Sequence, residues 1–91
     1  MLKRLHIFVS GTVQGVFFRQ STTVKAKECG LKGWVRNLKD GRVEIVCEGN
    51  EDSLNIMLEW CKKGPDRAFV DNVDARWEEF KDEFNGFQTV Y

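Results

Sequence analysis

The stretch from Gly11 to Arg19 has the residue types and spacing of an anion site. It contains two glycines followed by a single arginine. An alternating apolar run precedes it and a segment with helical spacing follows, so it is predicted to be a strand–loop–helix junction. Backbone N–H groups at a helix N-terminus have no intrahelical partners and favour negatively charged ligands such as phosphate. Arg19 adds a permanent positive charge at the same place.

Composition excludes several classes of partner. The chain has 91 residues, and its 14 Lys and Arg residues equal its 14 Asp and Glu residues, so no net charge favours nucleic acid or an anionic membrane. The apolar run near the N-terminus is too short for a signal peptide, and no other run approaches the length of a membrane span. We expect one domain over residues 1–91, in which any anion site must be local.

The three cysteines, Cys29, Cys47 and Cys61, form no Cys-x-x-Cys pair and fall on apolar faces of the predicted elements. We interpret them as reduced, buried residues of a cytoplasmic protein, without a disulfide or metal role. Cys61 and Arg67 match Cys-x5-Arg, the bare spacing of cysteine-dependent phosphatases. Cys61 falls at the C-terminal end of a predicted helix, where the helix dipole repels anions, so we reject a cysteine mechanism.

Hydrophobic periodicity predicts the order of the elements. One helix is expected over residues 18–29, and a second begins after the N-cap Asn50 and ends at Gly64-Pro65. Alternating side chains predict strands over residues 5–10, 31–38, 42–48 and 70–77, with a possible short edge strand over 87–91. The order is therefore β-α-β-β-α-β, with one optional strand.

The turn between the second and third predicted strands decides which side chains face the core. A two-residue Asp-Gly turn would bury Arg36, and an unpaired buried arginine costs several kcal/mol. A three-residue loop, Lys39-Asp40-Gly41, with its glycine left-handed, avoids this cost. It places Arg36 opposite Glu44 on the outer face. Asn37 then lies on the inner face, at the end of the second strand.

Both helices must cover one face of the sheet to bury their apolar stripes, and crossovers between parallel strands are right-handed. These rules predict an α+β fold, a ferredoxin-like two-layer sandwich with the antiparallel sheet order 4-1-3-2. The first and second strands then run in the same direction and end at the same edge. The glycine loop leaves the first strand at that edge, and Asn37 ends the second strand there. Topology therefore brings Arg19 and Asn37 together.

Three stretches of this chain resemble the acylphosphatase family, and the similarity extends over nearly all of its length. They are Gly11-x-Val13-Gln14-Gly15-Val16-x-Phe18-Arg19, Gly33-Trp34-Val35-Arg36-Asn37 and Asp40-Gly41-x-Val43-Glu44. Members of the family often carry proline where this chain has Lys39. That difference affects the rigidity of a turn and not the chemistry.

The resemblance implies a metal-independent hydrolase that cleaves the carboxyl-phosphate bond of small acyl phosphates and needs no cofactor. It implies that Arg19 and Asn37 are the catalytic residues, with Asn37 holding the attacking water. Inorganic phosphate would be a product and a competitive inhibitor, and the protein would be a monomer. The phosphoryl group would be bound by the loop amides and the arginine of one segment, namely Gln14, Gly15, Val16, Phe17, Phe18 and Arg19.

Two other function classes are compatible with the order of the elements. A non-catalytic domain of this family would bind an anion or a protein within a larger enzyme, but the presence of both Arg19 and Asn37 argues against it. RNA-recognition modules share the β-α-β-β-α-β order, but they need exposed aromatics on two central strands with basic surroundings. Here Phe8 on the first strand has no such counterpart on the third. We therefore expect no nucleic-acid partner and no membrane partner.

Overall fold

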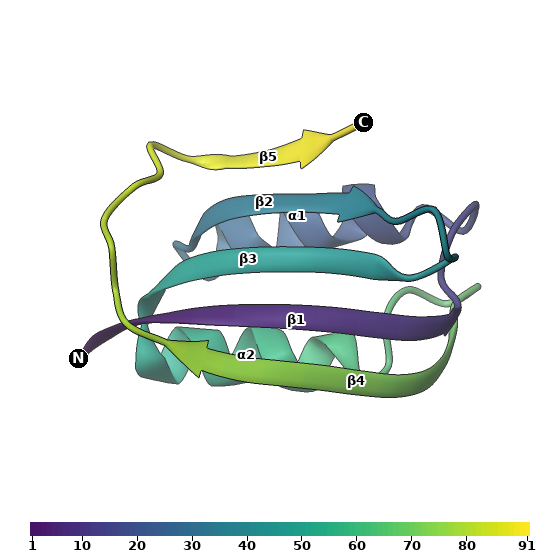
Figure 1. Ribbon diagram of the computed structural model, residues 1–91, viewed down its shortest axis with the longest axis horizontal. Coiled ribbons are helices and arrows are strands. Elements are labelled where there is room, and N and C mark those ends of the chain that lie inside the picture. Colours follow the sequence, from purple (N-terminus) through teal and green to yellow (C-terminus); the bar gives the residue numbers. More distant parts are fainter.

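A computed structural model describes all 91 residues of the chain. Figure 1 shows two layers, a sheet and two helices that both lie behind the same face of it. The elements are β1 (Leu2–Thr12), α1 (Phe18–Glu28), β2 (Lys32–Asn37), β3 (Val43–Asn50), α2 (Glu51–Cys61), β4 (Phe69–Glu78) and β5 (Phe87–Val90). Neither helix is long and apolar enough to span a bilayer.

The sheet has five strands in the order β4-β1-β3-β2-β5. The predicted α+β ferredoxin-like fold and the order 4-1-3-2 are confirmed, and the optional edge strand is present as β5. This strand pairs in parallel with β2, with Gly33 opposite Phe87 and Arg36 opposite Val90. Since parallel strands end at the same edge, β5 finishes beside the end of β2 (Figure 1). A third chain segment therefore reaches the edge where Arg19 and Asn37 were expected to meet.

The predicted register of the β2–β3 hairpin is confirmed. Arg36 lies opposite Glu44, and Asn37 lies opposite Val43. The N–H of Leu38 donates to the carbonyl oxygen of Arg42 at 2.8 Å, which closes a three-residue loop. The last residue of that loop, Gly41, is left-handed with φ of 96°. Asn37 is thus fixed at the very end of β2, and only Leu38 separates it from the loop.

The core lies between the helices and the inner face of the sheet. Alternate residues of β1 supply its centre, and Leu5, Ile7 and Val9 are fully buried. The helices add one stripe each: Phe18, Thr22 and Ala26 from α1, and Leu54, Met57 and Cys61 from α2. Burying one aliphatic or aromatic side chain of this kind contributes about 1.5–3 kcal/mol. The core therefore fixes β1 and α1, and with them the loop that joins the two.

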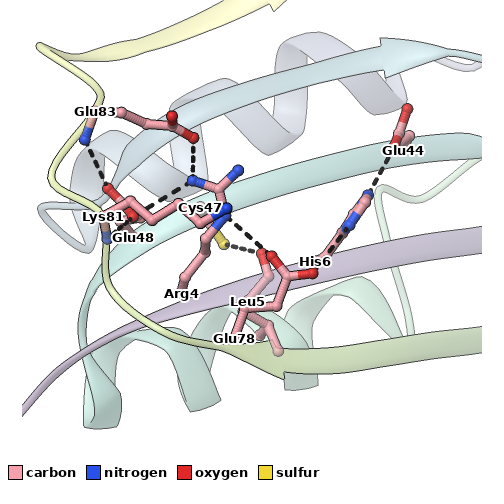
Figure 2. A network of polar contacts seen from close by, with 9 residues as sticks. All are labelled: Arg4, Leu5, His6, Glu44, Cys47, Glu48, Glu78, Lys81 and Glu83. Atoms are coloured by element: carbon pink, nitrogen blue, oxygen red, sulfur yellow. Dashed lines mark hydrogen bonds and ion pairs between the residues drawn. The ribbon is translucent and has the colours of Figure 1, made fainter.

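One expectation about burial needs correction, and the outer face of the sheet adds a finding of its own. Cys47 and Cys61 are buried and all three cysteines are unpaired, but Cys29 is only half-buried because it follows the last residue of α1. The outer face of β3 is not solvent-exposed, since Glu44 and Glu48 are 6% and 3% exposed. Long side chains of the neighbouring strands cover these carboxylates, as in the cluster around Arg4 in Figure 2.

Candidate active site

The loop between β1 and α1 presents free backbone donors at the start of a helix. Residue Phe17 occupies the N-cap position with a left-handed φ of 62°, and no side chain caps the helix. Gly15 is also left-handed, with φ of 76°. Such a backbone is strained for a phenylalanine, and strain of this kind is often found at ligand sites. The uncapped N–H groups and the positive end of the helix dipole make this loop suited to an anion.

The loop borders a cavity of about 270 Å³ at the edge of the sheet. Four of the predicted site residues line it, namely Gly15, Phe17, Phe18 and Arg19, and Asn37 lines it from the end of β2. The expected convergence of the glycine loop, Arg19 and Asn37 is therefore present in the structure. Gln14 and Val16 do not line the cavity.

Arg19 lies in the first turn of α1, half-buried, with its charge unpaired. No carboxylate lies within 4 Å of its guanidinium group. Its Nη1 donates a hydrogen bond to the carbonyl oxygen of Val90 at 3.2 Å. The guanidinium also stacks over the ring of Tyr91, 4.5 Å from the ring centroid. These two contacts orient the cation and leave most of its donors free for an anion.

Asn37 brings an unsatisfied acceptor to the same cavity. Its side-chain oxygen, Oδ1, is buried and has no hydrogen-bond partner in the protein. Buried polar atoms are nearly always hydrogen-bonded, so an orphaned one in a cavity indicates a site for a donor molecule. A water molecule is small enough to fill this role, and an asparagine amide can both accept from it and donate to it.

Gln14 has a different role from the other residues of the loop. Its Nε2 donates to the carbonyl oxygens of Leu38 and Arg42 at 2.7 and 2.9 Å. The side chain thereby ties the loop to the β2–β3 hairpin, next to the position of Asn37. Val16 packs against the core instead. A role for either residue in holding an anion thus depends on its backbone N–H.

The sequence did not predict the wall of the cavity that is formed by β5 and the residue after it. Thr89 and Tyr91 line the cavity, and the hydroxyl of Thr89 hydrogen-bonds that of Thr23 on α1 at 2.7 Å. No local pattern signals this, because the pairing of β5 with β2 joins segments more than fifty residues apart. The expected short edge strand was the nearest available signal.

The structure also bears on the cysteine alternative. Cys61 is the last residue of α2, is fully buried, and lies outside the cavity. Burial raises the pKa of its thiol well above the ordinary value, so the thiolate needed for nucleophilic attack is disfavoured. Elsewhere in the chain, no group of three or more His, Cys, Asp or Glu side chains is arranged to hold a metal ion.

A family model described as Acylphosphatase matches residues 5–89. The chain belongs to the acylphosphatase family. A protein of Marinobacter nauticus named Acylphosphatase is 53% identical over 90 residues, which cover 99% of this chain and 98% of that protein. The solved acylphosphatase of Coxiella burnetii has a TM-score of 0.93 and 44% identity, covering 98% of this chain and 93% of that one.

One similar structure belongs to a much larger protein. The solved full-length HypF, in a phosphate- and nucleotide-bound form, has a TM-score of 0.87 and 28% identity. The match covers all of this chain but only 12% of that protein. The same fold therefore occurs both in acylphosphatases of this length and as a small part of a longer chain.

Proposed function

We propose that this acylphosphatase-family chain hydrolyses the carboxyl-phosphate bond of small acyl phosphates, releasing a carboxylate and inorganic phosphate. One observation carries the proposal: the unpaired guanidinium of Arg19 and the orphaned Oδ1 of Asn37 line the same cavity beside uncapped amides. The cation and the amides suit a phosphoryl group. The acceptor suits a water molecule. In this proposal the two halves of a hydrolytic site are adjacent.

The chemistry of an acyl phosphate asks little of the protein beyond positioning and charge stabilisation. The leaving group is a carboxylate, a weak base that needs no general acid to protonate it. Arg19 offers a planar fork of donors that matches two phosphoryl oxygens. The amides of the loop, from Gln14 to Arg19, would add donors to the charge that develops in the transition state. Losing one such donor typically costs about 2.7–4 kcal/mol.

In this proposal Asn37 holds the attacking water through its side-chain amide. The buried Oδ1 would accept a hydrogen bond from the water, which gives a partner to an otherwise unsatisfied atom. An ionised carboxylate at this position would repel the phosphoryl oxygens. A neutral amide orients the water without adding that repulsion.

We further propose that residues 1–91 act as a single domain and as a monomer, in the cytoplasm. The cysteines are three in number and form no Cys-x-x-Cys pair, a usage that suits a reducing compartment. The substrate is proposed to be a small acyl phosphate, with inorganic phosphate competing for the same cavity as a product. Size-exclusion chromatography with light scattering tests the oligomeric state, and a dimer at micromolar concentration would contradict it.

The function is tested by measuring hydrolysis of benzoyl phosphate by the purified protein in the presence of a chelator. We expect turnover that survives chelation and is competitively inhibited by phosphate. Arg19→Lys should nearly abolish activity, since a lysine offers no planar fork. Asn37→Ala should lower kcat about 100-fold while keeping the affinity for phosphate.

Cys61→Ser serves as the control and should keep full activity. Loss of activity in this variant, if folded, would return the cysteine mechanism to consideration. Weaker phosphate binding with intact turnover in Asn37→Ala would mean that this residue holds the anion and not the water. Phosphate binding without turnover in the wild type would indicate a non-catalytic anion-binding module.

A further inference from the structure

Glu48 is a buried acid at the opposite end of the sheet from the cavity. It lies on the outer face of β3 and is only 3% exposed. It sits opposite Arg4 and Lys32, near the starts of β1 and β2. Asn37 and Val43 lie opposite each other at the cavity end of the same hairpin. Val43 is five residues from Glu48 along β3, a distance of roughly 17 Å. The proposed reaction makes no use of Glu48.

The contacts of Glu48 join the sheet to the segment between β4 and β5, residues 79–86. Its Oε2 accepts a hydrogen bond from the backbone N–H of Lys81 at 2.7 Å, and its Oε1 accepts one from Glu83 at 3.3 Å. Arg4 lies 3.5 Å from the same carboxylate and also pairs with the side chain of Glu83. Figure 2 shows these groups gathered around Arg4. One carboxylate thus anchors the connection at two residues, Lys81 and Glu83.

That connection leads directly into β5, the shortest strand of the sheet. This strand has four residues and pairs along one side only, with β2. At its start the carbonyl oxygen of Gly86 accepts from the N–H of Gly33 at 2.9 Å, and Phe87 is buried. Figure 1 shows the connection running along the edge of the sheet far from the cavity, after which β5 returns toward it. An edge strand this short depends on its anchors to stay in place.

The far end of β5 contacts the proposed phosphate-binding arginine. The carbonyl oxygen of Val90 accepts from Arg19, and the ring of Tyr91 lies under the guanidinium. Thr89 is tied to α1 through Thr23, whose hydroxyl also donates to the carbonyl oxygen of Arg19. A shift of β5 would therefore release the guanidinium and open one wall of the cavity.

We propose that Glu48 is a remote positioning residue for Arg19. Its carboxylate fixes the β4–β5 connection, the connection fixes β5, and β5 holds the guanidinium at the angle that suits a phosphoryl group. The proposal rests on the proposed function only for the role of Arg19. The mechanical part, from Glu48 to β5, stands on the contacts alone.

Glu44 provides a matched control for Glu48. It lies on the same strand and face, is 6% exposed, and is bound to His6 and Arg36 at 2.7 Å each. No hydrogen bond or ion pair joins it to residues 79–86. Removing either buried carboxylate disrupts an ion pair with an arginine, but only Glu48→Ala removes the two backbone hydrogen bonds that hold the connection.

The experiment compares Glu48→Ala and Glu44→Ala by hydrogen exchange and by titration with inorganic phosphate. In Glu48→Ala we expect exchange of the amides of residues 87–90 to rise about tenfold, with a phosphate Kd about fivefold weaker. In Glu44→Ala the exchange of β5 and the Kd should match the wild type, even where the two variants lose similar global stability. Equal exchange of β5 in both variants would overturn the proposal, and so would faster exchange with an unchanged Kd.

Two further variants keep the test decisive if Glu48→Ala fails to fold. Glu48→Gln retains an oxygen that can accept one of the two backbone N–H groups, so it should restore part of the protection and the affinity. Glu83→Ala removes only an exposed contact of the connection with Arg4, and should shift both readouts in the same direction by a smaller factor. An unchanged β5 in both variants would contradict the anchoring role. A wild-type protein that does not bind phosphate would refute the proposed function, while the exchange measurements would still test the anchor.

Discussion

At the scale of single residues, Gln14 contributes through its side chain as well as its backbone. Its side-chain amide donates two hydrogen bonds, one to the carbonyl oxygen of Leu38 and one to that of Arg42. We expect Gln14→Glu to lower the free energy of unfolding by about 2–3 kcal/mol at pH 7, because a carboxylate cannot donate and would face two carbonyl oxygens. Urea denaturation measures this loss.

Gln88→Glu makes the same chemical change at an exposed position of β5 and should alter stability by less than about 0.5 kcal/mol. A loss of equal size in both variants would show that added negative charge, and not the lost donors, is responsible. The hairpin end that carries Asn37 would then not depend on Gln14.

The sequence was informative about Arg19 and Asn37 because each is fixed by local chemistry and by topology together. A glycine loop before a helix predicts the position of Arg19, and the burial cost of Arg36 sets the register that places Asn37. The bridging role of Gln14 could not be predicted, since its partners are backbone carbonyls whose positions depend on the folded hairpin.

At the scale of elements, the close approach of β2 and β3 depends on Gly33. A Cβ at this position would lie 1.9 Å from the carbonyl oxygen of Val46, and φ is 145°, where side chains are strained. We expect Gly33→Ala to destabilise the fold by about 3 kcal/mol, since the strands must separate to admit the methyl group. Thermal or urea unfolding checks this value.

Gly86 is the matched position, because nothing lies within 4 Å of a Cβ built there and its φ is not left-handed. Gly86→Ala should change stability by no more than about 0.5 kcal/mol. If the two alanine variants are equally stable, the sheet can relax around Gly33 and the close approach is not essential.

The elements themselves were predictable where their periodicity was clear. The stripe of Leu54, Met57, Leu58 and Cys61 predicted α2, and both helices lie on the expected face. The position of β5 was not predictable in the same way. Its four residues carry little periodicity, and its partner β2 lies far away in the sequence. The cavity wall formed by Thr89 and Tyr91 was therefore missed together with the pairing.

At the scale of the whole molecule, equal numbers of acidic and basic residues leave no net charge, and several charged side chains pair with one another on the outer face of the sheet. Glu44 shows the consequence for stability at low pH. Burial alone would raise the pKa of its carboxyl, but hydrogen bonds and charges from His6 and Arg36 outweigh burial and hold the pKa below its usual 4.5. The unfolded chain therefore takes up this proton at a higher pH than the folded protein does.

The free energy of unfolding should consequently fall as the pH drops below about 4.5, through the folded pKa of Glu44. Urea denaturation at a series of pH values measures the decline, and Glu44→Gln should flatten part of it. If the free energy of unfolding falls with the same slope at low pH in wild type and variant, other carboxylates control acid unfolding.

At alkaline pH, the fall in the free energy of unfolding should be governed by the buried thiols. Burial raises the pKa of Cys47 to about 12, from an ordinary value of 9.0, and also raises that of Cys61. Both thiols stay protonated in the folded protein while those of the unfolded chain ionise above pH 9, so the unfolded state binds fewer protons and stability falls as the pH rises. Each thiol contributes a slope of about 1.4 kcal/mol per pH unit between its unfolded and folded pKa.

Cys47→Ala should remove one such increment from the slope of stability against pH, whatever the substitution costs in packing at neutral pH. An unchanged slope would show that the ionisation of Cys47 is not linked to unfolding.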